Sequence, residues 1–366
     1  MMKYSLLPLA LFFILCFDSC KPRGGDPCAF EFDQTTMLSN IGNNIITPAY
    51  DALKQRVDAL DAATTTFLSN RSLGALDTLQ SAWWAAQEAW QKAMIYEFGP
   101  AEIQQLRSSL NNFPVFVTRL EAAVQSGTYN LAIDSFAYTR GFPALDYLLY
   151  GVGANNSDIL AKYDTDTDAT NRRQYLQDVV TQIKTKVDLV HSEWAGYKTS
   201  FASTTGVATG SPVALLVNEF NHNYEFFKNN KLGTPVGAKN SYIPAADKTE
   251  AYYSRRSLDL MRISVRAMQE LFEGKGGIGL YEYVAAANVD KDGILLQDLI
   301  KDQFTTIING LDALPGSSLY DAIQNNFNDL KTIYGNAQNM VVYLKTDMPS
   351  VLCVSITYVD NTDDGD

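Results

Sequence analysis

The stretch of sequence that decides the fold of this chain runs Arg140-Gly141-Phe142-Pro143-Ala144-Leu145-Asp146-Tyr147-Leu148-Leu149-Tyr150-Gly151. Pro143 fits the first turn of a helix, because the N–H group that proline lacks has no partner there in any case. Its side chain also has no hydrogen-bonding atom. Arg140 and Asp146 are the charged residues of this stretch and its candidate ligand-binding residues.

The rest of the chain is predicted to be mainly helical. Apolar residues recur at the three- and four-residue spacing of a buried helix face. The predicted helical segments are Ile45–Leu60, Leu76–Met94, Phe113–Val124, Tyr175–Trp194, Pro212–Asn229, Glu250–Gly274, Leu296–Leu314 and Ser317–Lys345. Strand signals are few, and the strongest is the β-branched segment Val351–Val359. The pattern predicts an all-α protein.

A Gly/Ser/Thr-rich stretch at 200–211 divides the chain near its middle and reads as a linker. We therefore expect a first helical bundle over 33–199 and a second over 212–366, which closes with an extended C-terminal segment.

The two halves of the sequence share short patterns of residues at the same spacing. Trp90 precedes Glu97 by seven residues, and Tyr224 precedes Lys231 by seven. Downstream, a Tyr-Thr-Arg triplet at 138–140 is matched by a Tyr-Ser-Arg triplet at 253–255. Repetition of this kind predicts two related bundles with pseudo-twofold symmetry.

The N-terminus reads as a targeting segment. Lys3 precedes an apolar run over Leu6–Phe17, which is too short to span a bilayer. Cys20 follows a small residue, as the lipidated cysteine of a lipoprotein does. We expect a signal peptide at 1–19, a lipid-tether linker at 20–32 and a lipid anchor in the cell envelope; simple secretion is the alternative.

The net charge bears on the class of partner, and the cysteine content bears on a possible disulfide. The formal net charge of −12 argues against a nucleic-acid partner, which needs a basic face. In an oxidising envelope Cys28 and Cys353 can pair as a disulfide, or they can remain two separate thiols.

Several motifs resemble those of the imelysin-like family, which comprises the M75 peptidases and iron-regulated envelope proteins. In that family the opening stretch reads Gly-x-His-x-x-Glu before a Tyr-Leu-Leu run; here Pro143 stands at the His position and Asp146 at the Glu position. Other matches, in family order, are Ser81-Ala82-Trp83-Trp84 through Phe98-Gly99-Pro100, Lys231-Leu232-Gly233-Thr234-Pro235-Val236-Gly237 and Met348-Pro349 through Asp360-Asn361. The resemblance implies a duplicated helical bundle and an iron-linked function.

Two groups of polar residues are the candidate ligand sites. If the turns of the first half converge as the resemblance implies, Glu97 and Asp146 face Arg140 near the junction of the halves. This group would bind a cation or an anionic substrate, or Arg140 would form an internal salt bridge with either carboxylate. The second-half counterparts are Lys231, Tyr252, Tyr253, Arg255 and Ser257, which either bind a small polar ligand or join the halves.

Other metal motifs are weaker. His222 and Glu225 form the only His-x-x-Glu of the chain and read as a solvated or capping pair. The acidic clusters at 164–168 and 288–293 approach calcium-loop spacing, but each lacks the bidentate Glu at the twelfth position. No His-Glu-x-x-His occurs, which excludes a zincin peptidase.

The sequence therefore favours an envelope lipoprotein that binds a cation or small ligand in iron-linked uptake. Glu97 and Asp146 are its predicted oxygen ligands, and iron or another hard cation is the expected cargo. An iron-uptake or outer-membrane receptor is the expected partner. Peptidase activity is doubted because Pro143 replaces the histidine that would hold a metal-bound water. The alternatives are a metallopeptidase-like enzyme and a partner-docking module with a vestigial site.

Overall fold

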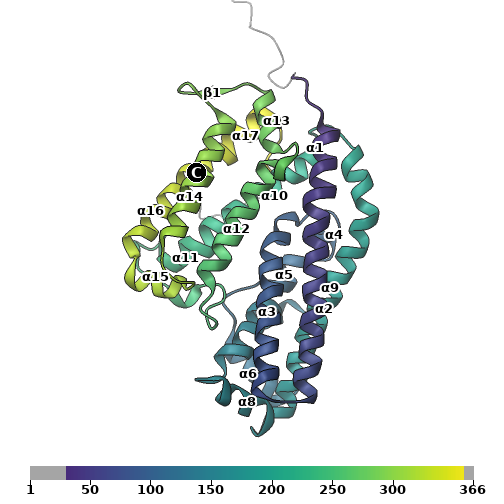
Figure 1. The fold of residues 1–366 in the computed structure, drawn as a ribbon, viewed down its shortest axis with the longest axis vertical. Helices are drawn as coiled ribbons and strands as arrows, with labels where there is room; N and C mark the ends of the chain where they lie inside the picture. Colours follow the sequence, from purple (N-terminus) through teal and green to yellow (C-terminus); the bar gives the residue numbers. More distant parts are fainter. Residues whose placement is uncertain (1–29, 358–366) are drawn as a thin grey trace, which may run out of the picture.

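Three long helices lie side by side in the first half of the chain (Figure 1). The computed structural model describes residues 30–357, so the predicted signal peptide, Cys20 and Cys28 lie outside the described residues. α1 (Gln34–Asn40) continues through the π-helical turns of η1 (Ile41–Ile46) into α2 (Thr47–Ser69). α2 packs between α3 (Leu73–Ala93) and α9 (Ala169–Ser203).

Shorter elements connect α3 to α9. They are η2 (Met94–Tyr96), α4 (Pro100–Ile103), α5 (Leu106–Leu110), α6 (Val117–Ser126), η3 (Asp134–Thr139), α7 (Gly141–Asp146), η4 (Tyr147–Gly151) and α8 (Asn156–Asp164). Most of these pack along α9, so α7, which carries the deciding stretch, is held against the first group of helices.

The second half is built around α12 (Ser257–Phe272), α14 (Leu296–Ala313) and α16 (Phe327–Val341), which pack in that order. The remaining elements are α10 (Pro212–Phe226), η5 (Phe227–Gly233), α11 (Thr234–Val236), η6 (Ala246–Lys248), η7 (Gly274–Gly276), α13 (Leu280–Ala286), β1 (Asp290–Lys291), β2 (Ile294–Leu295), α15 (Leu319–Asn325), η8 (Val342–Asp347) and α17 (Met348–Leu352). α12 also packs on α3, and this contact joins the two halves.

Helical periodicity accounts for the core. Leu53, Val57 and Leu60 of α2 are buried, as their spacing predicts. The same holds for the apolar face of α9. Trp83 and Trp90 of α3 are fully buried and supply the bulk of the first half's interior. The all-α prediction is confirmed; the pseudo-twofold relation between the halves stays a prediction.

Several sequence-based predictions differ from the structure. α9 runs on to Ser203, so the first residues of the predicted 200–211 linker are helical. α12 begins at Ser257 rather than Glu250, because residues 249–256 form a turn-rich loop. No strand forms over 351–357, the described part of the strand predicted for Val351–Val359: α17 covers Met348–Leu352, and the residues after it extend without a paired neighbour among the described residues.

Candidate functional site

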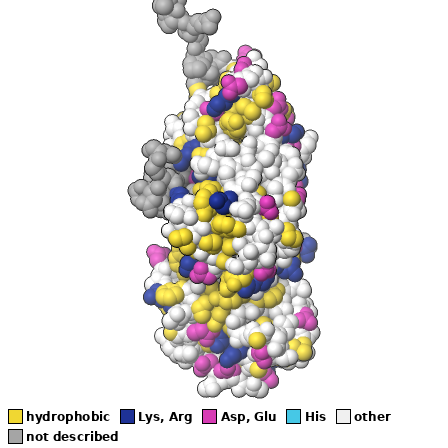
Figure 2. All heavy atoms as spheres, turned by 90° about the vertical axis from the view of Figure 1, so that its left-hand side faces the viewer, with side chains coloured by type: hydrophobic (Ala, Val, Ile, Leu, Met, Phe, Trp, Pro, Cys, Tyr) yellow, Lys and Arg dark blue, Asp and Glu magenta, His cyan; other side chains and the backbone are white. Residues whose placement is uncertain are grey.

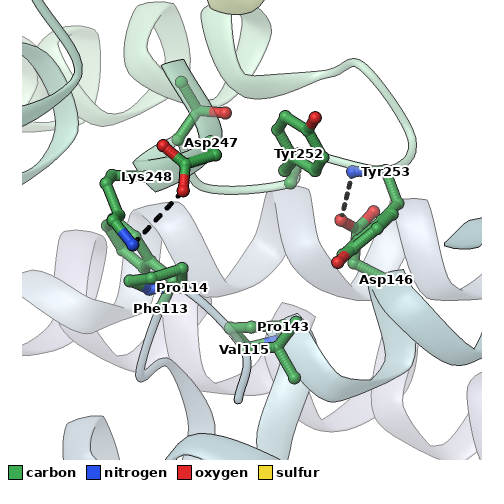
Figure 3. A pocket seen from close by; sticks show the side chains of 11 residues that line it. Phe113, Pro114, Val115, Pro143, Asp146, Asp247, Lys248, Tyr252 and Tyr253 are labelled. Atoms are coloured by element: carbon green, nitrogen blue, oxygen red, sulfur yellow. Dashed lines mark hydrogen bonds and ion pairs between the residues drawn. The ribbon is translucent and has the colours of Figure 1, made fainter. Parts of the chain in front are cut away.

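A pocket of about 150 Å³ lies where the first half meets the second (Figure 3). First-half residues form one wall, and residues before and after Glu250 form the other. The lining residues are Phe113, Pro114, Val115, Pro143, Asp146, Asp247, Lys248, Thr249, Ala251, Tyr252 and Tyr253. The pocket therefore includes Pro143 and Asp146, the two positions at which this chain departs from the motif that it resembles.

Gly141 explains how the deciding stretch enters its helix. Its φ of +74° is a conformation that residues with a side chain rarely adopt. A Cβ atom here would lie 2.3 Å from the carbonyl oxygen of Leu110. Pro143 lies in the first turn of α7, as predicted, and faces the pocket without loss of a hydrogen bond.

Asp146 joins the two halves through main-chain hydrogen bonds. Its carboxylate accepts the N–H groups of Tyr253, at 2.8 Å, and Ser254, at 3.0 Å. Burial raises the pKa of Asp146 to about 6, although these hydrogen bonds and the Ser254 side chain act to lower it. The nearby Glu250 carboxylate adds to the increase. Asp146 therefore holds the second-half loop in place while it lines the pocket.

The second wall is a loop with strained backbone. Ala251 and Arg255 both adopt positive φ values, 48° and 60°. The Arg255 guanidinium lies 3.9 Å from the ring centre of Tyr320 and 4.7 Å from that of Tyr252. Arg255 thus packs between Tyr252 of the loop and Tyr320 of α15. Tyr252 and Tyr253 are the candidate residues of this half that line the pocket.

Lys231 and Ser257, the other second-half candidates, are buried and do not line the pocket. Ser257 accepts the main-chain N–H of Leu319 at 2.8 Å. Lys231 forms an ion pair with Glu250, and the two side chains are 1% and 2% exposed. Lys231 also donates to Gln91 Oε1 at 2.6 Å, and Glu250 accepts from Gln91 at 3.0 Å and from Asn111 at 2.9 Å. Burial lowers the pKa of Lys231 against the pull of Glu250. This cluster ties the halves together.

Glu250 is the residue that the sequence did not reveal. It lies in a loop without periodicity, and its partners come from three separate segments: α3, Asn111 and Lys231. The Lys231 loop, which the family resemblance marked, is the one signal that pointed to this region.

Glu97 belongs to a different network. Its carboxylate accepts the main-chain N–H of Arg107 at 2.9 Å. The Arg107 side chain forms an ion pair with Glu219 and lies 3.1 Å from Nδ1 of His222. Burial raises the pKa of Glu97 to about 7, against the lowering effect of Arg107.

The predicted grouping of Glu97, Arg140 and Asp146 needs correction. No hydrogen bond or ion pair joins any two of them in the described part of the chain. Arg140 instead donates to the carbonyl oxygens of Leu131, at 2.6 Å, and Ser108, at 3.2 Å. The internal salt bridge that was the alternative does not form either, because Arg140 neutralises neither carboxylate.

The weaker metal motifs have other partners. Glu225 pairs with Lys228 at 3.0 Å rather than with His222. In the first acidic cluster, Asp164 and Asp166 pair with Arg71 and Lys162. Within residues 30–357, no group of three or more His, Cys, Asp or Glu side chains is arranged to hold a metal ion.

The ends of the described chain bear on the envelope prediction. Cys353 is disulfide-bonded, and Cys28, its predicted partner, lies outside the described residues. Cys353 lines a small pocket together with Phe30 and Phe32, which follow Cys28 closely in sequence. Among residues 30–357, no helix has the length and apolar character needed to cross a membrane.

Oxygen donors and apolar walls set the chemistry of the pocket. Asp146 and Asp247 supply carboxylates, and Tyr252 and Tyr253 supply phenol groups. Lys248 is the one cationic lining residue, and it pairs with Asp247 at 3.3 Å (Figure 3). No imidazole or thiol lines the pocket, so its donors suit a hard cation or a small polar molecule better than zinc.

The chain is an all-α protein of two packed groups of helices. Its pocket lies at a Gly-x-Pro-x-x-Asp segment, residues 141–146. The chain belongs to the imelysin family, Peptidase_M75, whose model matches residues 46–344. It is 20% identical over 308 residues to iron-regulated protein A of Synechococcus elongatus, covering 82% of this chain and 79% of that protein.

Two crystal structures share the fold. One is of a chain assigned as an iron-regulated protein A precursor from Parabacteroides distasonis, with a TM-score of 0.70, 17% identity and coverage of 87% of this chain and 95% of that one. The other is of an imelysin-like protein from Psychrobacter arcticum, with a TM-score of 0.68, 16% identity and coverage of 90% and 99%. The resemblance predicted from the sequence motifs is therefore confirmed.

Proposed function

We propose that this protein is a binding protein of the cell envelope whose pocket takes a small ligand in iron-linked uptake. The observation that carries the proposal is the pocket itself, which lies at the motif position and is lined by carboxylates, phenols and apolar side chains. A hard cation that keeps part of its water shell or arrives with a small chelator fits this lining. Its oxygen atoms can meet the polar groups, and its carrier can meet the apolar walls.

A binding role agrees with the chemistry of the pocket better than peptidase activity. Hydrolysis of a peptide needs an activated water or nucleophile. Pro143 supplies no nitrogen ligand, and both oxygens of Asp146 already accept main-chain N–H groups. The Asp247 side chain pairs only with the neighbouring Lys248 among the described residues, and it is 64% exposed. Because it is exposed, it remains available to a ligand.

The link to iron rests on the named relatives. Iron-regulated protein A of Synechococcus elongatus and the Parabacteroides distasonis chain both carry iron regulation in their names. We extend this to the present chain as a role in uptake, with an outer-membrane receptor or iron-uptake system as partner. The envelope setting rests on the apolar Leu6–Phe17 run and on Cys20 as the lipid anchor.

Calorimetric titration of the purified protein with ferric citrate, Ca²⁺ and Zn²⁺ tests the binding role. We expect ferric citrate or Ca²⁺ to bind, and Asp247→Asn to weaken that binding on the order of tenfold, as loss of a charge-assisted contact does. Asp302→Asn, an exposed change on α14, is the matched control. Zinc retained in a one-to-one ratio through dialysis, together with peptidase activity, would overturn the proposal. So would failure of both hard-cation probes to bind.

Cell fractionation tests the envelope setting separately. Cys20→Ala should move the protein from the membrane to the soluble envelope fraction. Unchanged membrane partitioning of the variant would remove the lipid anchor from the proposal and leave the pocket untouched.

A further inference from the structure

A second groove, with a volume of about 170 Å³, lies on the seam between α2, α3 and α12. Its floor is made of small apolar side chains from all three helices: Ala49 and Ala52, Ala89, and Ala267. Because α2 and α3 belong to the first half and α12 to the second, both halves build the groove. Its volume lies below the range of drug-sized sites and admits only a small molecule.

Tyr96 is the buried residue of this lining whose side chain carries a hydrogen-bonding group. The residue is 2% exposed, yet it lines the groove. Its main-chain carbonyl accepts from Tyr50, but its hydroxyl makes no hydrogen bond to any described residue. Burial, with a contribution from Glu270, raises the pKa of Tyr96, so the phenol stays protonated and can donate.

Three charged side chains surround the same groove without an ion pair to any described residue. Lys92 lies in the last turn of α3, Glu270 in the last turn of α12 and Lys275 in η7, and all three residues are exposed. Elsewhere on this acidic protein, lysines such as Lys54, Lys162 and Lys184 have carboxylate partners. The two lysines attract a carboxylate, and Glu270 attracts an ammonium group, so the groove offers a partner for each sign of charge.

We propose that this groove is a binding site for a small zwitterion, an α-amino acid with a short apolar side chain. Its carboxylate would meet Lys92, Lys275 and the Tyr96 hydroxyl, and its ammonium group would meet Glu270. Its side chain would rest on the alanine floor. Charge complementarity identifies the ligand class, since a zwitterion is the small molecule that satisfies both signs at once.

Calorimetric titration of the full-length protein with L-valine tests this site. Isobutylamine and 3-methylbutanoate, which each lack one of the two charged groups, are the comparison ligands. We expect saturable binding of L-valine and at least about tenfold weaker binding of each comparison ligand, as the loss of one charge-assisted contact predicts. Glu270→Gln and Lys92→Gln should each weaken L-valine binding by a similar factor.

A steric variant separates the groove from the rest of the surface. Ala52 is exposed on α2, so Ala52→Phe should fill the groove and abolish L-valine binding without disturbing the core. Ala62→Phe makes the same change at an exposed position of α2 that does not line the groove, and it should leave binding unchanged. The proposal is overturned if L-valine does not bind in the millimolar range, if Ala52→Phe binds it normally, or if 3-methylbutanoate binds equally well.

Discussion

Replacing Lys231 with methionine removes the cation from an ion pair that holds the two halves of the protein together. Methionine keeps the length of the side chain and its apolar stem but leaves Glu250 as a buried carboxylate without its counter-charge. Because Glu250 is 2% exposed, water cannot replace the lost partner.

The expected cost follows from what remains around Glu250. Removing one partner of a buried ion pair typically costs about 3–5 kcal/mol. Glu250 still accepts amide hydrogen bonds from Gln91 and Asn111, which places Lys231→Met near the lower value, about 3 kcal/mol. That is a large part of the roughly 5–15 kcal/mol that stabilises a typical domain. The double change Lys231→Met with Glu250→Gln should recover much of the loss, because no unpaired charge is left.

Urea unfolding followed by tryptophan fluorescence measures the effect. The matched control is Lys162→Met, which breaks an ion pair with Asp166 of 2.7 Å whose side chains are 41% and 25% exposed. An exposed pair of this kind contributes about 0–1 kcal/mol. If Lys231→Met is no more destabilising than Lys162→Met, or if the double variant is less stable than the single one, the reasoning about the buried pair is wrong.

Three further predictions test other parts of the structure. Because the pKa of Asp146 is raised to about 6, its stabilising effect is present below its unfolded value of 3.8 and is lost as the pH rises through 6. Between pH 4 and pH 7 the free energy of unfolding of the parent should therefore fall by about 3 kcal/mol relative to that of Asp146→Asn. Melting temperatures of the two proteins that change in the same way with pH would contradict this. Gly141→Ala should destabilise by more than about 1 kcal/mol, whereas Gly74→Ala, at an open helical position, should stabilise slightly; urea unfolding distinguishes them. Mass spectrometry of the non-reduced protein should find a peptide linking Cys28 to Cys353, and a different partner for Cys353 would refute the pairing.

The helices could be predicted from sequence because each buries one repeating face. Val179, Ile183, Val187 and Val190 recur at helical spacing and are all buried in α9. Local composition was a poorer guide over 351–357, where β-branched residues predict a strand and the structure has none. A strand forms only with a neighbour to pair with, and local composition does not report one.

The candidate site was harder to predict because its polar groups bind backbone atoms from distant segments. Arg140 donates to two carbonyl oxygens, and Asp146 accepts two N–H groups of the opposite half. A carbonyl or N–H group is present at nearly every residue, so no sequence pattern marks the one that becomes a partner. The grouping of Arg140 with Glu97 and Asp146, which the family resemblance implied, therefore does not form.

The motif segment contains two residues that support the fold, Gly141 and Asp146, and one that decides the chemistry of the pocket, Pro143. Gly141 is required by backbone geometry, and Asp146 holds the opposite loop, so both positions support the local structure. Pro143 lies between them in the first helical turn, where its missing N–H costs nothing, and its side chain faces the pocket. The histidine position of the family can therefore be lost without loss of the structure around it. It follows that Pro143→His should fold normally and add a nitrogen ligand beside the two pocket carboxylates, and a gain in zinc affinity would show that the pocket keeps the metal-binding geometry implied by the family motif.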